Sequence, residues 1–187
     1  MAIRKVGVLG CGLMGSGIAE IAAKAGFETV VREVSDGLLE KGMGRIRGSL
    51  ARAVEKGKMT AEERDVVLGR IQGTTGFEAM ADCDLVVEAI VENLDEKKST
   101  YAALDKVVQP AAIFASNTSS LTVTQLAMAT SRPSRFVGLH FFNPVPVMKL
   151  VEVVRTLLTD DAVLAEVDVF CRALGKTPVA CRDNSGF

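Results

Sequence analysis

The sequence has 187 residues, of which 48% are hydrophobic, enough for one α/β domain with a full core and too apolar for a disordered chain. Its formal net charge of -1 gives no basic footprint for nucleic acid, and charged residues interrupt every apolar run before it could span a membrane. We therefore expect neither nucleic acid nor a membrane among its partners. The first residues enter a predicted strand almost at once and leave no room for a secretion signal, which predicts a cytoplasmic protein.

The cysteines and the histidine give no pattern typical of a metal site. Four cysteines occur without CxxC spacing, and there is one histidine. The sequence therefore predicts reduced thiols that serve as small core residues, and no bound metal.

The first 33 residues show the pattern of a strand, a glycine-rich turn, a helix and a second strand. Residues 6–9 are an apolar run, GCGLMG follows at 10–15, a helical pattern covers 16–25, and the apolar pair 30–31 leads to Glu33. A bare GxGxxG motif also occurs by chance in glycine-rich chains. Its position between a strand and a helix, with an acid about 20 residues further on, favours a dinucleotide-binding turn.

Each residue of this turn has an expected role. Gly10 permits the tight turn, Gly12 lets a pyrophosphate approach the backbone, and Gly15 lets the helix pack closely. Backbone N–H groups at the helix N-terminus, around Leu13 and Met14, are expected to bind the phosphates.

Glu33 is expected to accept a hydrogen bond from a ribose hydroxyl of the dinucleotide. A carboxylate there repels a 2′-phosphate, so the sequence favours NAD over NADP. The neighbouring Arg32 makes this a preference.

Strand and helix patterns alternate through most of the remaining chain. Helices are predicted over 37–56, with Ser35 as N-cap, over 60–68, opened by a capping box, and over 93–108, capped by Asn93. Two more are predicted over 122–128 and over 159–174, the second capped by Thr159 and ended by Gly175. Strands are predicted over 71–74, 84–87, 113–115, 136–139, 150–154 and 177–181.

The order of these elements predicts the fold class. About ten residues join the strands at 136–139 and 150–154, too few for a helical crossover, so this pair is expected to be antiparallel. The fold expected is therefore α/β: a Rossmann-type, doubly wound, mostly parallel sheet with an antiparallel addition and a helical insertion after the second strand.

His140 and Glu152 form a second candidate constellation. His140 follows an apolar run at a strand end, and Glu152 lies on the neighbouring predicted strand between aliphatic residues. A His–Glu pair would hold the imidazole in one tautomer and raise its basicity, as a general base needs. A structural histidine and an edge-strand glutamate that faces water fit the spacing equally well.

Several short polar side chains lie at other predicted strand ends. Asn117, Ser119 and Asn143 could bind a substrate oxygen or the nicotinamide ribose, although any one of them alone is more typical of a turn. Glu92 and Lys97 by themselves resemble a solvated helix cap and a surface lysine.

Four segments together resemble a known family. GCGLMGSGIAE, DCDLVVEAIVENLDEKK, ASNTSSLTVTQLA and GLHFFNPVPVMKLVEVVR, in this order, closely resemble the L-3-hydroxyacyl-CoA dehydrogenases, over essentially the whole chain. The resemblance implies reversible, NAD-dependent oxidation of a (3S)-3-hydroxyacyl-CoA, such as 3-hydroxybutyryl-CoA, to the 3-ketoacyl-CoA. The resemblance implies a reaction of fatty acid or butanoate metabolism.

The resemblance also implies roles by position. The catalytic set would be His140 as base, Glu152 as its orienting partner, and Ser119 and Asn143 around the reacting centre. Cofactor contacts would come from Gly10, Gly12, Leu13, Met14, Gly15, Glu33, Glu92, Lys97, Ser119 and Asn143. Coenzyme A and substrate contacts would come from Ser49, Lys56 and Ser119.

The sequence departs from the family in two places. Glu33 stands where the family usually has Asp, a change of one methylene. The family continues beyond a Gly-Phe like that at 186–187 into a helical domain that completes the substrate site and forms the dimer. We therefore expect residues 1–187 to be the NAD-binding domain alone, to bind NAD but turn over poorly, and the full-length protein to be a homo-oligomer through that further domain.

Two other functions are consistent with the same residues. One is a non-catalytic NAD(H)-binding protein, similar to a lens crystallin or a redox sensor, which would have no need of a base. The other is a dehydrogenase of a free hydroxy acid or sugar acid.

Overall fold

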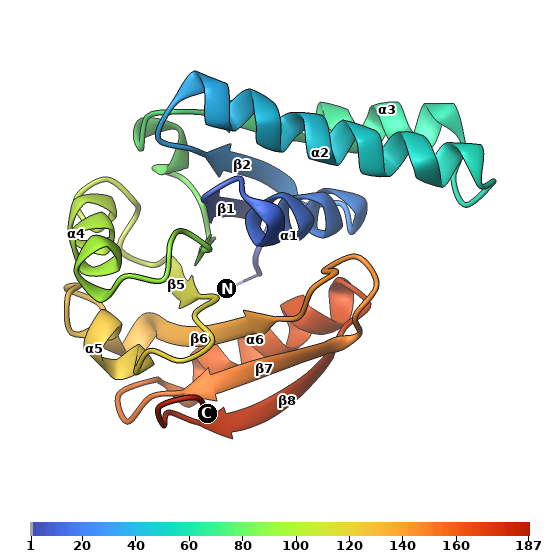
Figure 1. Cartoon of the computed structure of the whole chain (residues 1–187). Helices are drawn as coiled ribbons and strands as arrows, with labels where there is room; N and C mark the ends of the chain where they lie inside the picture. Colours follow the sequence, from blue (N-terminus) through green and yellow to red (C-terminus); the bar gives the residue numbers. More distant parts are fainter. Residues whose placement is uncertain (1) are drawn as a thin grey trace.

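The computed structural model describes residues 2–187, and its centre is one eight-stranded sheet with the order β3-β2-β1-β4-β5-β6-β7-β8 (Figure 1). The strands are β1 (Lys5–Leu9), β2 (Glu28–Arg32), β3 (Ile71–Thr74), β4 (Leu85–Glu88), β5 (Ile113–Ser116), β6 (Phe136–Phe141), β7 (Leu150–Arg155) and β8 (Thr177–Arg182). All neighbouring strands are parallel except β6 and β7, which are antiparallel. The predicted mostly parallel sheet with an antiparallel addition is confirmed.

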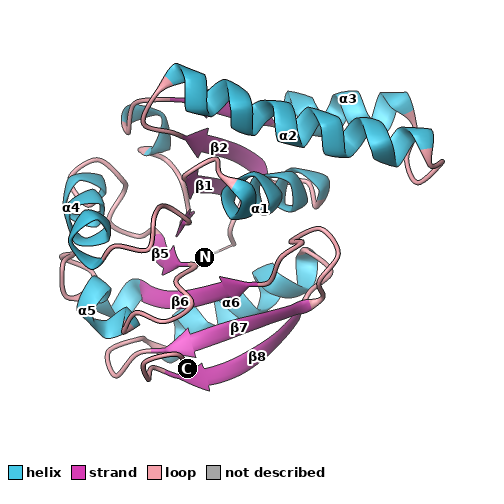
Figure 2. Ribbon diagram, in the orientation of Figure 1, coloured by secondary structure: helices cyan, strands magenta, loops and turns pink. Residues whose placement is uncertain are grey.

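Helices cover both faces of this sheet, as Figure 2 shows. They are α1 (Leu13–Lys24), α2 (Asp36–Glu55), α3 (Ala61–Gly69), α4 (Leu94–Leu104), α5 (Val123–Ala127) and α6 (Asp161–Ala173), with short 3-10 helices η1 (Glu78–Met80) and η2 (Pro133–Arg135). Helices α2 and α3 are the predicted insertion after the second strand. They lie side by side and extend beyond the sheet (Figure 1).

The helices and the sheet form three layers, and an apolar core lies on each face of the sheet. On one face, side chains of α1, α2, α3 and α6 pack against the sheet, with Ile18, Leu50 and Phe170 among the buried residues. On the other face, α4 and α5 pack around Tyr101 and Phe114. Strands β1, β4 and β5 have almost no polar side chains because helices cover both of their faces.

The predicted helix starts are confirmed at three of four caps. Asn93 accepts hydrogen bonds from Asp95 N and Glu96 N at the start of α4. Ser35 accepts a hydrogen bond from Leu38 N, and Thr60 forms the complete capping box with Glu63. Thr159 is not a cap, and that prediction is wrong: Asp160 occupies the N-cap position of α6. The hydroxyl of Thr159 donates instead to the carbonyl of Phe136, because the residue is buried in a turn against β6.

Candidate active site

The glycine-rich turn has the geometry that its sequence predicts. Gly10 has a φ of 88°, and a Cβ on it would lie 2.6 Å from the carbonyl oxygen of Ala89. A Cβ on Gly15 would lie 1.9 Å from the carbonyl oxygen of Gly10. No atom lies within 4 Å of the place where a Cβ of Gly12 would be, so the backbone here is open to a ligand.

The N-terminus of α1 follows this open turn directly. Gly12 is the N-cap, and no side chain caps the helix or places an acid in its first turn. The first backbone N–H groups of a helix have no partner inside it, and the helix dipole adds positive potential. The turn and the helix start therefore form a site suited to a pyrophosphate.

Glu33 lies beside the same turn, immediately after β2. Its Oε2 accepts a hydrogen bond from Cys11 N at 2.9 Å, and its Oε1 accepts one from Val34 N at 2.8 Å. Arg32 is held elsewhere: its guanidinium lies 4.3 Å from the ring centre of Phe77, and its Nε donates to the carbonyl of Thr75.

His140 and Glu152 are paired directly across the antiparallel strands β6 and β7. They are partners in the register of the two strands, and His140 Nδ1 lies 2.7 Å from Glu152 Oε2. Both side chains are partly buried, and the ring centre of Phe142 lies 4.5 Å from that of His140. The predicted contact between the two side chains is therefore present, and their catalytic role stays a prediction.

A cavity of about 350 Å³ brings several of the predicted residues together at the carboxyl ends of the parallel strands. Its lining includes His140, Ser119, Asn143, Glu92 and Lys97, together with Met14, Ala89, Ile90, Asn117, Phe141 and Phe142. Met14 belongs to the glycine-rich turn, so the cavity connects the candidate phosphate site with the His–Glu pair.

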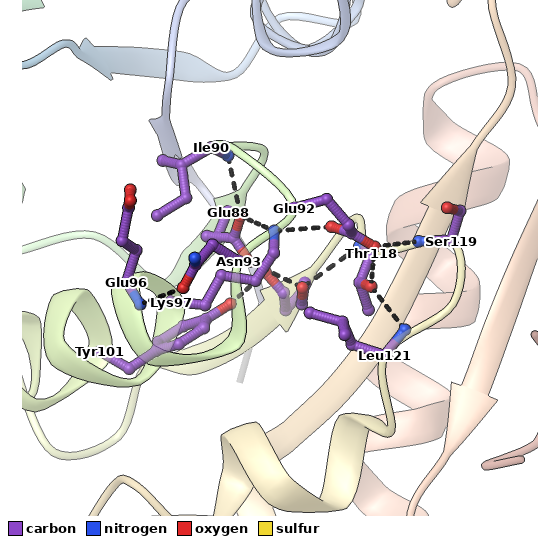
Figure 3. A network of polar contacts seen from close by, with 12 residues as sticks. Glu88, Ile90, Glu92, Asn93, Glu96, Lys97, Tyr101, Thr118, Ser119 and Leu121 are labelled. Carbon is purple, nitrogen blue, oxygen red and sulfur yellow. Dashed lines mark hydrogen bonds and ion pairs between the residues drawn. The ribbon is translucent and has the colours of Figure 1, made fainter. Parts of the chain in front are cut away.

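Lys97 is the centre of a buried polar network (Figure 3). Its side chain is 1% exposed, and Nζ lies 2.5 Å from Glu88 Oε1 and 3.2 Å from Glu92 Oε2. The interpretation of Lys97 as a surface lysine is therefore wrong, because α4 packs its first turns against the end of β4. Partial burial acts to raise the pKa of Glu92, but the Thr118 hydroxyl and the Lys97 ammonium outweigh it and lower that pKa.

The two residues expected near coenzyme A lie in different surroundings. Ser49 lines a groove of about 410 Å³ between α1, α2 and residues 143–147, a groove that also contains Arg45 and Arg52. Lys56 lies two turns further on, exposed, as the C-cap of α2, and it is not among the groove residues.

Two further residues shape the site and were absent from the sequence-based candidates. Glu88 ends the buried strand β4 and is the inner partner of Lys97. Its sequence signal is an acid that closes an apolar run. Arg45 donates from Nη1 to the carbonyl of Cys11 at 3.3 Å, which joins α2 to the glycine-rich turn, and no local pattern indicates this contact.

Asn117, one of the predicted polar residues, has a structural contact in addition to its place on the cavity wall. Its side-chain oxygen accepts from Phe141 N and so fixes the end of β6.

Over residues 2–187, no group of three His, Cys, Asp or Glu side chains is arranged to hold a metal ion. The helices of the same residues are all too short or too polar to cross a bilayer.

The fold and the turn together define the class of this protein. A doubly wound sheet whose first strand leads through GxGxxG into a helix, with an acid after the second strand, is a Rossmann-type dinucleotide-binding domain. A family model described as the NAD binding domain of 3-hydroxyacyl-CoA dehydrogenase matches residues 5–184. The chain belongs to this family.

Individual relatives agree with the family match. The chain is 51% identical over 188 residues to a 3-hydroxybutyryl-CoA dehydrogenase of Mycobacterium tuberculosis, covering all of this chain and 66% of that protein. It is 44% identical over 191 residues to the mitochondrial hydroxyacyl-coenzyme A dehydrogenase of Rattus norvegicus, covering 99% of this chain and 61% of that protein. The crystal structure of (S)-3-hydroxybutyryl-CoA dehydrogenase from Ralstonia eutropha matches with a TM-score of 0.97 and 42% identity, over all of this chain and 66% of that one. The chain thus spans a little under two thirds of the length of these relatives.

The family identifies NAD as the cofactor of this domain, and the residues present fit it. The open backbone at Gly12 and the uncapped start of α1 suit its pyrophosphate. The Glu33 carboxylate lies beside the glycine-rich turn, where it adds negative charge, and the Arg32 guanidinium contacts Phe77 and the carbonyl of Thr75. These contacts favour a dinucleotide without a 2′-phosphate.

Proposed function

We propose that the protein takes part in the reversible oxidation of a (3S)-3-hydroxyacyl-CoA, such as 3-hydroxybutyryl-CoA, to the 3-ketoacyl-CoA. The observation that carries this proposal is the His140–Glu152 pair at the edge of the cavity that also contains Ser119 and Asn143. A binding protein without catalytic activity has no need of an oriented imidazole beside its cofactor site.

His140 acts as the general base in this proposal. Glu152 accepts from Nδ1–H, which leaves Nε2 unprotonated and able to take the proton of the substrate hydroxyl. NAD, when bound, accepts the hydride from the carbon that carries this hydroxyl. The proton and the hydride leave the same alcohol, and the carbonyl of the 3-ketoacyl product remains.

Ser119 and Asn143 position the reacting groups. Both are exposed residues on the cavity wall, in the loops that follow β5 and β6. Their hydroxyl and amide groups donate hydrogen bonds to the substrate oxygen and to the nicotinamide ribose. Glu92, which accepts from Ser119 N, and its neighbour Lys97 contact the cofactor beside the same loop.

The groove between α1 and α2 accommodates coenzyme A. Ser49 contributes a hydroxyl there, and Arg45 and Arg52 supply positive charge suited to phosphates. Lys56 contacts the phosphates from the end of α2. This groove favours a CoA thioester over a free hydroxy acid or sugar acid.

The test uses residues 1–187 as they stand. NADH binding is followed by fluorescence titration, and turnover is followed as the loss of NADH with acetoacetyl-CoA at high protein concentration. We expect micromolar or tighter NADH binding and slow turnover, since the family resemblance implies that a helical domain completes the substrate site. His140→Ala should lower this turnover at least about 100-fold with the NADH affinity unchanged.

Two results would contradict the proposal. Wild-type protein that binds NADH but shows no turnover with any acyl-CoA, also when joined to the helical domain of a relative, would favour a non-catalytic binding protein. Turnover that survives His140→Ala would remove the base from its role.

A further inference from the structure

Glu88 is the most completely buried carboxylate near the cavity. It lies at the end of β4, its side chain is 0% exposed, and it is not among the residues that line the cavity. Its Oε1 accepts from Lys97 Nζ at 2.5 Å and from Ile90 N at 2.8 Å, and its Oε2 accepts from Ser116 Oγ at 2.7 Å. Burying a carboxylate costs free energy unless donors satisfy both of its oxygens. The three donors around Glu88 meet this requirement and fix its side chain in one position.

One chain of contacts runs from Oε1 of Glu88 to the loop that carries Ser119. Lys97 Nζ also contacts Glu92 Oε2 at 3.2 Å. The other oxygen of Glu92 accepts from Ser119 N at 3.1 Å and from the hydroxyl of Thr118 (Figure 3). The ammonium of Lys97 therefore holds Glu92 in the position where it binds the Ser119 backbone.

A second chain of contacts runs from Oε2 of Glu88 to the same loop. Because the Ser116 hydroxyl donates its hydrogen to Glu88, its oxygen is oriented to accept from Thr118 N, at 3.2 Å. Both oxygens of Glu88 thus lead to the segment 118–119, one through α4 and one through β5.

We propose that Glu88 is a positioning residue that sets the place of Lys97, Glu92 and Ser119 relative to the bound dinucleotide. The proposal rests on the proposed function for its ligand, NAD. The contacts that position the three residues are present in the protein without ligand. Glu88 touches no ligand and acts through the two chains of contacts.

Glutamine cannot replace Glu88 in this role. An amide of the same shape offers one acceptor and one donor, whereas the site contains three donors that all point at the side chain. The amide –NH₂ must face either the Lys97 ammonium or the Ser116 hydroxyl. In the first case two donors meet, and in the second the Ser116 hydroxyl must rotate to accept and loses the orientation that it holds toward Thr118 N. In both cases the Lys97 ammonium loses the charge of Glu88 as its partner.

The experiment compares Glu88→Gln with Asp105→Asn. Asp105 forms a comparable ion pair with Arg132, largely buried and outside the cavity, so its loss lowers stability without touching the Ser119 loop. Amide hydrogen exchange is measured in both variants without ligand, and NADH affinity is measured by fluorescence, both well below the unfolding temperatures.

We expect faster exchange at Thr118 and Ser119 and a rise of about tenfold in the NADH dissociation constant for Glu88→Gln alone. Exchange at these two amides that matches the wild type, or that rises equally in Asp105→Asn, would overturn the proposal. So would an unchanged NADH affinity in Glu88→Gln while the wild type binds NADH.

A second variant covers the case in which Glu88→Gln does not fold. Ser116→Ala breaks only the second chain of contacts and leaves every charge in place, so we expect faster exchange at Thr118 with Glu92 still bound to Ser119. Unchanged exchange at Thr118 in Ser116→Ala would count against the proposal. If wild-type protein fails to bind NADH, the proposed function fails, and the exchange measurements still decide whether Glu88 positions the loop.

Discussion

Gly42 of α2 lies directly against Cys11 of the glycine-rich turn. A Cβ on Gly42 would lie 2.2 Å from Cys11 Sγ and 2.3 Å from the carbonyl oxygen of Cys11. Arg45, one turn further along α2, donates to that same carbonyl. The helix that lines the proposed coenzyme A groove and the turn proposed to bind the pyrophosphate are therefore in direct contact.

Gly42→Ala is expected to separate these two elements. The added methyl group has no room, so α2 must move away from the turn at a cost of about 1–3 kcal/mol in the free energy of unfolding. Urea denaturation measures the loss. Gly44→Ala is the control, because Gly44 has no atom closer than 4.0 Å to a new Cβ and alanine there should gain up to about 1 kcal/mol. Equal effects of the two changes would contradict the contact.

Glu152→Gln tests what the charge of Glu152 contributes. Glutamine keeps an oxygen that can accept from His140 Nδ1–H, so the ring can hold its orientation, but the negative charge that stabilises an imidazolium is lost. We expect turnover with acetoacetyl-CoA to fall by about 10- to 100-fold at unchanged NADH affinity. Steady-state rates and fluorescence titration measure the two effects. A variant as active as the wild type would show that orientation alone suffices.

Local sequence signals predicted the elements and much of the site. Thr60 and Glu63 cap α3 through contacts within one turn, so their pattern is sufficient. His140 and Glu152 could be paired because a short connection forces β6 and β7 to be antiparallel neighbours.

Residues whose role depends on packing between distant elements could not be predicted in this way. Lys97 is buried only because α4 places it over Glu88 at the end of β4, and nothing in residues 93–98 indicates this. Thr159 looks like a helix cap by type, but burial against β6 gives its hydroxyl a different acceptor.

The thiols provide a prediction about reactivity and pH. Burial raises the pKa of Cys11 to about 11 and those of Cys83 and Cys171 to about 12. Burial also raises the pKa of Cys181, but this thiol is only partly buried and a reagent can reach it. We expect a disulfide reagent at about pH 8 to label Cys181 quickly and the other three only as the chain unfolds. Cys181→Ser should remove the fast phase. A second fast thiol in the native protein would contradict this burial.

The same pKa shifts predict alkaline destabilisation. The folded thiols keep their protons above the ordinary value of 9.0, so the unfolded chain binds fewer protons than the folded chain between that value and about 11–12. Their effect on stability is therefore constant below pH 9, and stability falls as the pH rises through this window. Urea midpoints measured across the window test the direction. Cys83→Ala should flatten the decline.

Arg132 joins its own turn to the end of α4 and the residues that follow it, and it contributes to stability. Its guanidinium donates to Asp105 Oδ1 at 2.7 Å and to the carbonyls of Val108 and Gln109, and it lies 4.4 Å from the ring centre of Phe114. Arg132→Met leaves a largely buried carboxylate without its partner and should cost about 3–5 kcal/mol in the free energy of unfolding.

Arg132→Lys separates charge from geometry at this position. Lysine keeps the charge, but its single ammonium cannot donate to a carboxylate and several carbonyls at once, as the planar guanidinium does. We therefore expect Arg132→Lys to recover only part of the stability that Arg132→Met loses. Arg172→Met is the control, since Arg172 forms an exposed ion pair with Asp168 and its removal should change little. Chemical denaturation of the three variants measures the differences. Full stability in Arg132→Lys would mean that the charge of Arg132, and not the set of hydrogen bonds from its guanidinium, holds the end of α4.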